Sequence, residues 1–263
     1  MSQGCDPSRI EDLYHRYGTA GGQRQQLDFE VTAEEISAAF EATATAVRGV
    51  RGSGPFHPSG TRRSLFDLDK ERGPLLNSLQ DTEHLQALLW SPPRWSVEDR
   101  SDLDFMFVAR EITPGSAVAG DKRTWVIEKD CQVSADLLLM NTSDRAPIVA
   151  EFKRGGDQNA EYALVQALAA AAQLTPARQR ARLRTEYSDH FGDDVPERLD
   201  VYVIVANPPP RGTRPKLFDR ALTHAAELTR SGRLDQWIRR IVFLEAKQKG
   251  RSLTFGVLDK PSG

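Results

Sequence analysis

Residues 133–153 read VSADLLLMNTSDRAPIVAEFK, which is two apolar segments separated by a short polar stretch. Both segments are predicted as strands because they are short, apolar and bounded by turn residues. The intervening residues 141–146 include Asn, Ser and Asp, which are typical of turns. We therefore expect strands over about 133–140 and 148–153, joined by a short turn that makes them an antiparallel pair.

The charged residues of this strand pair form the candidate site. Strand side chains alternate between the two faces of a sheet, so Glu151 and Lys153 project to the same side. Asp136 lies on the preceding strand, with fourteen residues between it and Glu151. Antiparallel pairing would bring the two carboxylates close together. Two carboxylates that face one point are an oxygen-ligand site for a hard cation such as Mg²⁺.

A divalent cation at this place would supply what the hydrolysis of phosphodiester bonds needs. It lowers the pKa of a bound water and neutralises the charge that grows on a phosphate. The Lys153 ammonium would orient that water or stabilise the transition state. The residues thus predict a nuclease that depends on Mg²⁺ or Mn²⁺, with Asp136 and Glu151 as metal ligands and Lys153 as a catalytic residue.

The rest of the chain predicts an α/β fold, a mixed sheet flanked by helices with an N-terminal helical extension. Thr32 and Glu35 form a capping-box pattern at the start of a helix. Helices are expected over about 33–48, 74–90, 160–174, 176–188 and 215–230, and the further strands over 103–112, 124–128, 199–206, 238–245 and 252–258. A loop over about 48–63, rich in Gly, Pro and Arg, divides an N-terminal helical portion (residues 1–63) from a core (residues 64–263).

The site residues also carry a resemblance to a known family. The pattern of Asp136, fourteen residues and then Glu151-Phe152-Lys153 resembles the D…(D/E)-x-K signature of the PD-(D/E)XK nuclease superfamily. The order of elements from the helix near Glu83 to the strand at 199–206 is also similar, and together they cover roughly half of the chain. The resemblance implies a restriction-endonuclease-like fold and metal-dependent cleavage of nucleic acid.

The resemblance adds two residues to the candidate site. In this superfamily a helix before the first strand often carries an acidic residue that helps to bind metal, and Glu83 lies at a suitable place for this catalytic and metal-binding role. In the exonuclease-like branch the helix after E-x-K carries a glutamine, and Gln166 lies where that catalytic residue is expected.

The chain departs from the family pattern at two positions. Ala135, rather than proline, precedes Asp136. Ala170, rather than tyrosine, lies four residues after Gln166, and Tyr162 lies four residues before it, on the same helical face.

Nucleic-acid binding would have to come from local clusters of arginine, because the net charge of the chain is −2. Arg178 and Arg182 share one side of the predicted helix that begins near Pro176. Arg154 follows the candidate site directly. We expect these three arginines to contact phosphates, with affinity that depends on salt. The alternative for the helix is a solvated face whose arginines pair with nearby acidic residues.

Plainer explanations remain open for each candidate. Glu-x-Lys occurs often by chance, and the chain has a second copy at Glu245-Ala246-Lys247, without an aspartate on a neighbouring upstream strand. Glu83 is equally explained as a solvated helix charge, and Gln166 as a buried amide bonded to the backbone. At the level of function, the alternatives are a non-catalytic nucleic-acid-binding member of the same fold and a protein-interaction module that uses the N-terminal helices.

Composition sets expectations for location and partners. The apolar runs are too short to span a bilayer, and the first residues lack the basic and apolar regions of a secretion signal. Two cysteines, Cys5 and Cys131, cannot form a disulfide framework or a four-cysteine zinc site. We expect a cytoplasmic protein with no membrane contact, whose partner is nucleic acid, with DNA favoured and RNA open. A homodimer is a further open alternative.

Overall fold

The computed structural model describes residues 8–19, 31–46, 94–114, 133–154, 159–193, 195–249 and 252–258. Within these ranges, seven strands form one sheet whose order follows the chain. They are β1 (Arg94–Trp95), β2 (Phe105–Ile112), β3 (Ala135–Asn141), β4 (Pro147–Arg154), β5 (Leu199–Ala206), β6 (Ile238–Lys249) and β7 (Ser252–Val257). The pairs β4–β5 and β5–β6 are parallel and the other neighbouring pairs are antiparallel. The predicted mixed α/β sheet with flanking helices is confirmed at this level.

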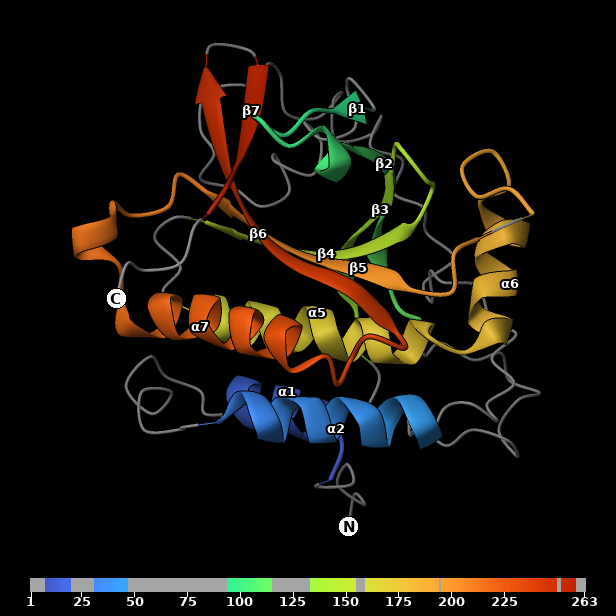
Figure 1. Cartoon of the computed structure of the whole chain (residues 1–263), viewed down its shortest axis with the longest axis horizontal. Coiled ribbons are helices and arrows are strands. Elements are labelled where there is room, and N and C mark those ends of the chain that lie inside the picture. Colours follow the sequence, from blue (N-terminus) through green and yellow to red (C-terminus); the bar gives the residue numbers. More distant parts are fainter. Residues whose placement is uncertain are drawn as a thin grey trace.

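Four of the described helices lie in two layers beneath the sheet, and a fifth, α6 (Ala177–Glu186), stands at one end of it (Figure 1). The four are α1 (Ile10–Thr19), α2 (Ala33–Ala46), α5 (Ala160–Leu174) and α7 (Lys216–Ser231), with short 3₁₀ turns η3 (Ser101–Leu103) and η6 (Arg211–Thr213) elsewhere in the chain. Helices α5 and α7 lie next to the sheet, and α1 and α2 lie below them (Figure 1). The segments that contain α5 and α7 connect parallel strands, which need such long crossovers. None of the described helices has the length and apolar character that crossing a bilayer requires.

Helix α5 is the central helix of the molecule, because it contacts the sheet on one side and the N-terminal helices on the other. The prediction of a buried helix over residues 160–174 is confirmed. Its small side chains allow this close packing, and the alanines at positions 169 to 172 have no exposed surface. Asn159 begins the helix, and its side chain accepts a hydrogen bond of 2.9 Å from the N–H of Tyr162.

Both faces of the sheet are buried. Alternate residues of β5 divide between two cores, with Val201 and Val203 on the helix-covered face and Tyr202 and Ile204 on the far face. Residues of α1 and α2 belong to the same core as α5 and the helix-covered face of the sheet. The described N-terminal helices are therefore packed onto the core.

The capping box at the start of α2 is confirmed. The N–H of Thr32 donates to Oε2 of Glu35 over 2.8 Å, and the N–H of Glu35 donates to Oγ1 of Thr32 over 3.2 Å. Pro176 was expected inside the first turn of the next helix. It instead precedes α6 with an extended backbone, ψ 141°, so that prediction was wrong by one position.

Other boundaries also differ from expectation. Strand β6 continues beyond the expected end at residue 245, because β7 pairs with its polar second half. Helix α1 was not predicted, although its apolar residues have helical spacing. The predicted helix over 74–90, the loop over 48–63 and the strand over 124–128 lie outside the described residues, as does the proposed boundary at residue 63.

Candidate functional site

The register of β3 and β4 determines how the two site carboxylates face each other. The strands are antiparallel, as predicted, and Leu137 lies opposite Ala150. The next opposed residues are therefore Asp136 and Glu151, and directly opposed residues lie on the same face of a sheet. Because Leu137 and Ala150 belong to the core on the far face, Asp136 and Glu151 both lie on the helix-covered face.

Each carboxylate accepts a hydrogen bond from the backbone of the opposite strand. The N–H of Asp136 donates to Oε1 of Glu151 over 3.1 Å, and the N–H of Phe152 donates to Oδ2 of Asp136 over 2.9 Å. At this end of the β3–β4 strand pair, the backbone N–H groups therefore donate to side-chain carboxylates and not to backbone carbonyls. This arrangement fixes both carboxylates beside each other.

Glu151 is a buried carboxyl group, and one of its two oxygens accepts no hydrogen bond from the described residues. Its side chain has no exposed surface, and among the described residues its Oε2 has no hydrogen-bond partner. Burial, and then the charge of Asp136, raises the pKa of Glu151 well above its ordinary value of 4.5, while Lys153 lowers it. Ionising this carboxylate therefore requires more positive charge than Lys153 alone supplies. A divalent cation bound by the pair would meet this requirement, so the residues fit a metal site.

Lys153 faces the carboxylates, as expected from strand alternation. Its Nζ lies 3.8 Å from Oε2 of Glu151, and its side chain is only 15% exposed. On its other side, Nζ lies 5.4 Å from the centre of the Tyr162 ring. The ammonium is therefore held between a carboxylate and an aromatic ring.

Gln166 lies on the same helix, close to the start of β3. Its Nε2 donates a hydrogen bond of 3.1 Å to the backbone oxygen of Ser134, two residues before Asp136. This contact corresponds to the plainer explanation, an amide that bonds to the backbone. It also holds α5 next to the strand that carries Asp136.

The remaining candidates either lie outside the described part of the chain or lie on α6. Glu83 lies outside the described residues, and so does the side chain of Arg154. On α6, Arg178 is exposed, whereas Arg182 contacts Gln179 and forms an ion pair of 3.3 Å with Glu186. Within the described ranges, no three His, Cys, Asp or Glu side chains gather as a metal cluster. Among the described residues, the carboxylate pair therefore stands without a third acidic or imidazole side chain beside it.

The second Glu-x-Lys copy has different surroundings. Nζ of Lys247 lies 2.5 Å from Oε1 of Glu245, but the two side chains are 59% and 23% exposed. The residue opposite Glu245 on β7 is Gly256, so no carboxylate faces it across this strand pair. This copy forms a surface ion pair, and it provides a matched control for the first.

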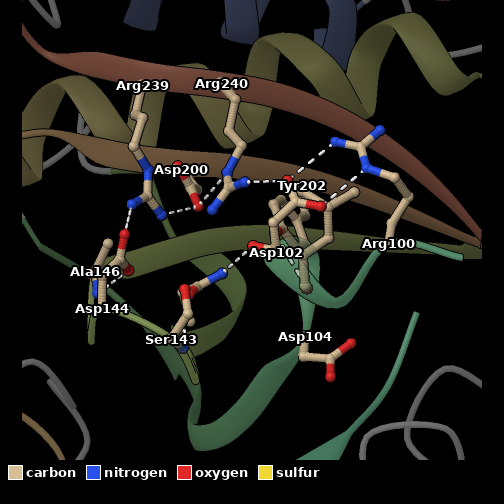
Figure 2. Close-up of polar contacts among 12 residues, drawn as sticks. Arg100, Asp102, Asp104, Ser143, Asp144, Ala146, Asp200, Tyr202, Arg239 and Arg240 are labelled. Carbon is tan, nitrogen blue, oxygen red and sulfur yellow. Dashed lines mark hydrogen bonds and ion pairs between the residues drawn. The ribbon is translucent and has the colours of Figure 1, made fainter. Parts of the chain in front are cut away.

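A separate charged cluster lies on the far face of the sheet. Figure 2 shows Arg239 and Arg240 reaching Asp200, with contacts of 2.7 Å and 2.9 Å from their Nε atoms. Arg239 also contacts Asp144, and Arg240 contacts Asp102 over 3.0 Å. Burial raises the pKa of Asp200 to about 6 and lowers that of Arg239 to about 10. Because these charges pair with one another, we assign the cluster a structural role, joining β5 and β6 to the turn before β4.

Two aromatic residues near the site, Tyr162 and Tyr14, were not among the predicted site residues. Tyr162 shares a helical face with Gln166, and that spacing was a signal for its position. Tyr14 lies on α1, and its ring stacks on Tyr162 with ring centres 5.2 Å apart. A contact between residues so far apart in the chain has no local signature.

Comparison of the chain with protein-family models, curated proteins and solved structures finds no match in any of the three. Its function has to be inferred from the site itself.

Proposed function

We propose that this chain is a metal-dependent nuclease of the PD-(D/E)XK type, with a restriction-endonuclease-like core, that hydrolyses phosphodiester bonds in DNA. The observation that carries the proposal is the buried carboxylate pair. Among the described residues Oε2 of Glu151 accepts no hydrogen bond, Asp136 lies opposite Glu151, and Nζ of Lys153 lies 3.8 Å from that Oε2. A buried carboxylate in this state is costly unless a cation or a proton neutralises it.

The roles follow from the position of each group. Asp136 and Glu151 would hold Mg²⁺ or Mn²⁺ through their carboxylate oxygens, with Glu83 as the candidate third ligand. When bound, the ion supplies a water of lowered pKa and neutralises charge on the phosphate. Lys153 donates hydrogen bonds towards the attacking water or the developing phosphate charge. Gln166 helps to hold α5 against the strand that carries Asp136.

Arginines would bind the substrate of this site. Arg154 adjoins the site in sequence, and Arg178 and Arg182 lie on α6. Of the two residues on α6, Arg178 is more accessible to a ligand, because Arg182 forms an ion pair with Glu186. We expect these contacts to involve the phosphate backbone and to weaken as salt rises.

A cleavage assay tests the proposal. Purified protein is incubated with linear, circular and single-stranded DNA and with RNA, in Mg²⁺, in Mn²⁺ and in chelator. We expect cleavage of DNA that requires the metal and falls by at least about 100-fold in Glu151→Gln and Lys153→Ala, as for the loss of one stabilising group in a preorganised site.

The second Glu-x-Lys copy supplies the controls. Glu245→Gln and Lys247→Ala remove the same groups at an exposed position and should retain the cleavage rate of the wild type. Binding of DNA without cleavage in any metal would contradict the proposal and support a binding protein. Neither binding nor cleavage would support an interaction module.

A further inference from the structure

Lys153 is one end of a row of stacked groups that leads from the site to the N-terminal helix. Its ammonium lies 5.4 Å from the centre of the Tyr162 ring. The Tyr162 ring stacks in turn on Tyr14, with ring centres 5.2 Å apart and planes inclined by 15°. A cation over a ring face within about 6 Å is attracted to it, and offset stacking between rings is also favourable.

The three groups come from three elements, β4, α5 and α1. Lys153 lies on β4, Tyr162 lies in the first turn of α5, and Tyr14 lies on α1, below α5 (Figure 1). Both rings are partly buried. The ring of Tyr162 therefore contacts both the Lys153 ammonium and a ring of α1.

Buried polar contacts hold α1 in place beneath α5. Glu11 of α1 is almost fully buried and accepts hydrogen bonds from Nε2 of Gln173 over 3.1 Å and from Oγ1 of Thr43 over 2.6 Å. These residues belong to α5 and α2. Because both acceptor oxygens of Glu11 are engaged, α1 is fixed against its neighbours, and so is the position of Tyr14.

The first turn of α5 is fixed as well. Glu161, next to Tyr162, has no exposed surface, forms an ion pair with Arg220 of α7, and has its Oε1 3.1 Å from Nδ1 of His224 of α7. The backbone of Tyr162 is thereby tied both to α7 through its neighbour and to the cap residue Asn159.

Tyr162 also lies within electrostatic reach of both carboxylates. Burial raises the pKa of Tyr162, and so do a hydrogen bond with Tyr14 and the charges of Glu151 and Asp136. The influence of both carboxylates indicates that Tyr162 shares their environment.

We infer that Tyr162 is a positioning residue for Lys153, that Tyr14 supports it, and that α1 is therefore part of the site. A lysine has a long flexible side chain with many rotamers. The ring of Tyr162 limits these rotamers to those that keep the ammonium beside Glu151. The aromatic face supplies this effect and the hydroxyl is not required for it.

An NMR measurement tests this inference without any activity. Protons above a ring face resonate upfield, so the ε-methylene signal of Lys153 should be displaced upfield in the wild type. The displacement should persist in Tyr162→Phe, disappear in Tyr162→Leu and decrease in Tyr14→Leu. Loss of the signal in Lys153→Arg assigns it, and the exposed Lys247 serves as the undisplaced reference. A Lys153 signal at the ordinary position in the wild type, or one that Tyr162→Leu leaves unchanged, would overturn the inference.

A kinetic measurement extends the test and rests on the proposed function. We expect Tyr162→Phe to keep most of the cleavage rate and Tyr162→Leu to lose about tenfold, which corresponds to about 1.4 kcal/mol. Binding of Mn²⁺, measured by calorimetry, should be unchanged in both. In a Lys153→Ala background, Tyr162→Leu should have no further effect, since a residue that acts through Lys153 has nothing left to position.

Together, the NMR and kinetic measurements distinguish failure of the positioning role from failure of the proposed function. A displaced Lys153 signal in a protein that cleaves nothing would sink the proposed function and leave the positioning role intact. Metal-dependent cleavage in which the Tyr162→Leu loss is equally large with and without Lys153 would sink the positioning role and leave the nuclease intact.

Discussion

Glu151 and Glu245 occupy the same tripeptide pattern, but their side chains have different surroundings. Glu151 has no exposed surface and faces Asp136, whereas the Glu245 side chain is 23% exposed and faces Gly256. Water stabilises the charge of the Glu245 carboxylate. The charge of the Glu151 carboxylate has to be stabilised by protein groups or by a ligand. Burial and the identity of the opposed residue therefore distinguish a candidate ligand from a surface ion pair.

Thr32 and Glu35 allow a prediction about pH at the scale of single residues. Hydrogen bonds from Thr32 lower the pKa of Glu35 below its ordinary value of 4.5. The folded protein thus binds this proton less tightly than the unfolded chain, so the stabilisation is present above about pH 4.5 and is lost as the pH falls through the lower folded pKa. Thr32→Ala should lower the free energy of unfolding by about 1 kcal/mol at pH 7, and by less below about pH 4.

Urea denaturation of the two proteins at several pH values measures this difference. The control is Thr223→Ala, an exposed threonine inside α7, which should change stability by no more than about 0.5 kcal/mol and show no such pH dependence. A cost of Thr32→Ala that stays constant down to pH 3 would contradict the account of this cap.

At the scale of the element, the alanines of α5 explain why the helix fits between the sheet and the N-terminal helices. Ala170 has no exposed surface and belongs to the main core. A tyrosine, which the exonuclease-like pattern carries at this position, would need space that the packed helix does not provide.

The same packing predicts the cost of a larger side chain. Ala170→Leu should destabilise the protein by about 1–3 kcal/mol, because added methylene groups in a filled core force neighbours out of place. Ala226→Leu is the matched control, since Ala226 of α7 borders a cavity of about 460 Å³ that can take the added atoms. Thermal unfolding of both variants tests this, and equal melting temperatures would contradict it.

Sequence patterns predicted the elements whose signals are local. The apolar character of residues 160–174 and 199–206 identified α5 and β5 with their observed bounds. Helix α1 was not predicted, although Ile10, Leu13, Tyr14 and Tyr17 have the spacing of one helical face. Its contact with α5, about 150 residues away, has no local signal. The full length of β6 was missed because its polar second half is a strand only through pairing with β7.

At the scale of the whole molecule, α1 and α2 share one core with α5, α7 and the sheet. Glu11 links these layers, and its loss would leave the hydroxyl of Thr43 and the amide of Gln173 buried without their acceptor. We expect Glu11→Ala to cost about 1–3 kcal/mol for each group left unpaired, and to weaken the whole fold and not α1 alone.

Denaturation followed by both far-UV circular dichroism and tryptophan fluorescence measures this effect. The two signals should give one coincident transition in the wild type and in Glu11→Ala, at lower denaturant in the variant. Glu34→Ala is the control, since the Glu34 side chain is 83% exposed and its ion pair with Arg233 contributes little. A separate early transition would instead mean that the N-terminal helices unfold independently.

The part of the candidate site that depends on local sequence patterns was predictable. Strand alternation placed Glu151 and Lys153 on one side, and the short turn at 141–146 indicated the antiparallel pairing that brings Asp136 opposite Glu151. The complete burial of Glu151 and the contact of Lys153 with Tyr162 could not be predicted. Both depend on the position of α5 against the sheet, which the packing of the whole molecule decides.

The location of Mn²⁺ in crystals of the protein, determined by anomalous scattering, tests the metal site most directly. The account predicts one ion bonded to a carboxylate oxygen of Asp136 and to one of Glu151, at about 2.0–2.6 Å from each. The ion should be absent in Glu151→Gln and present in Glu245→Gln. An ordered carboxylate pair with no ion between its members, at Mn²⁺ concentrations that saturate the protein, would contradict it.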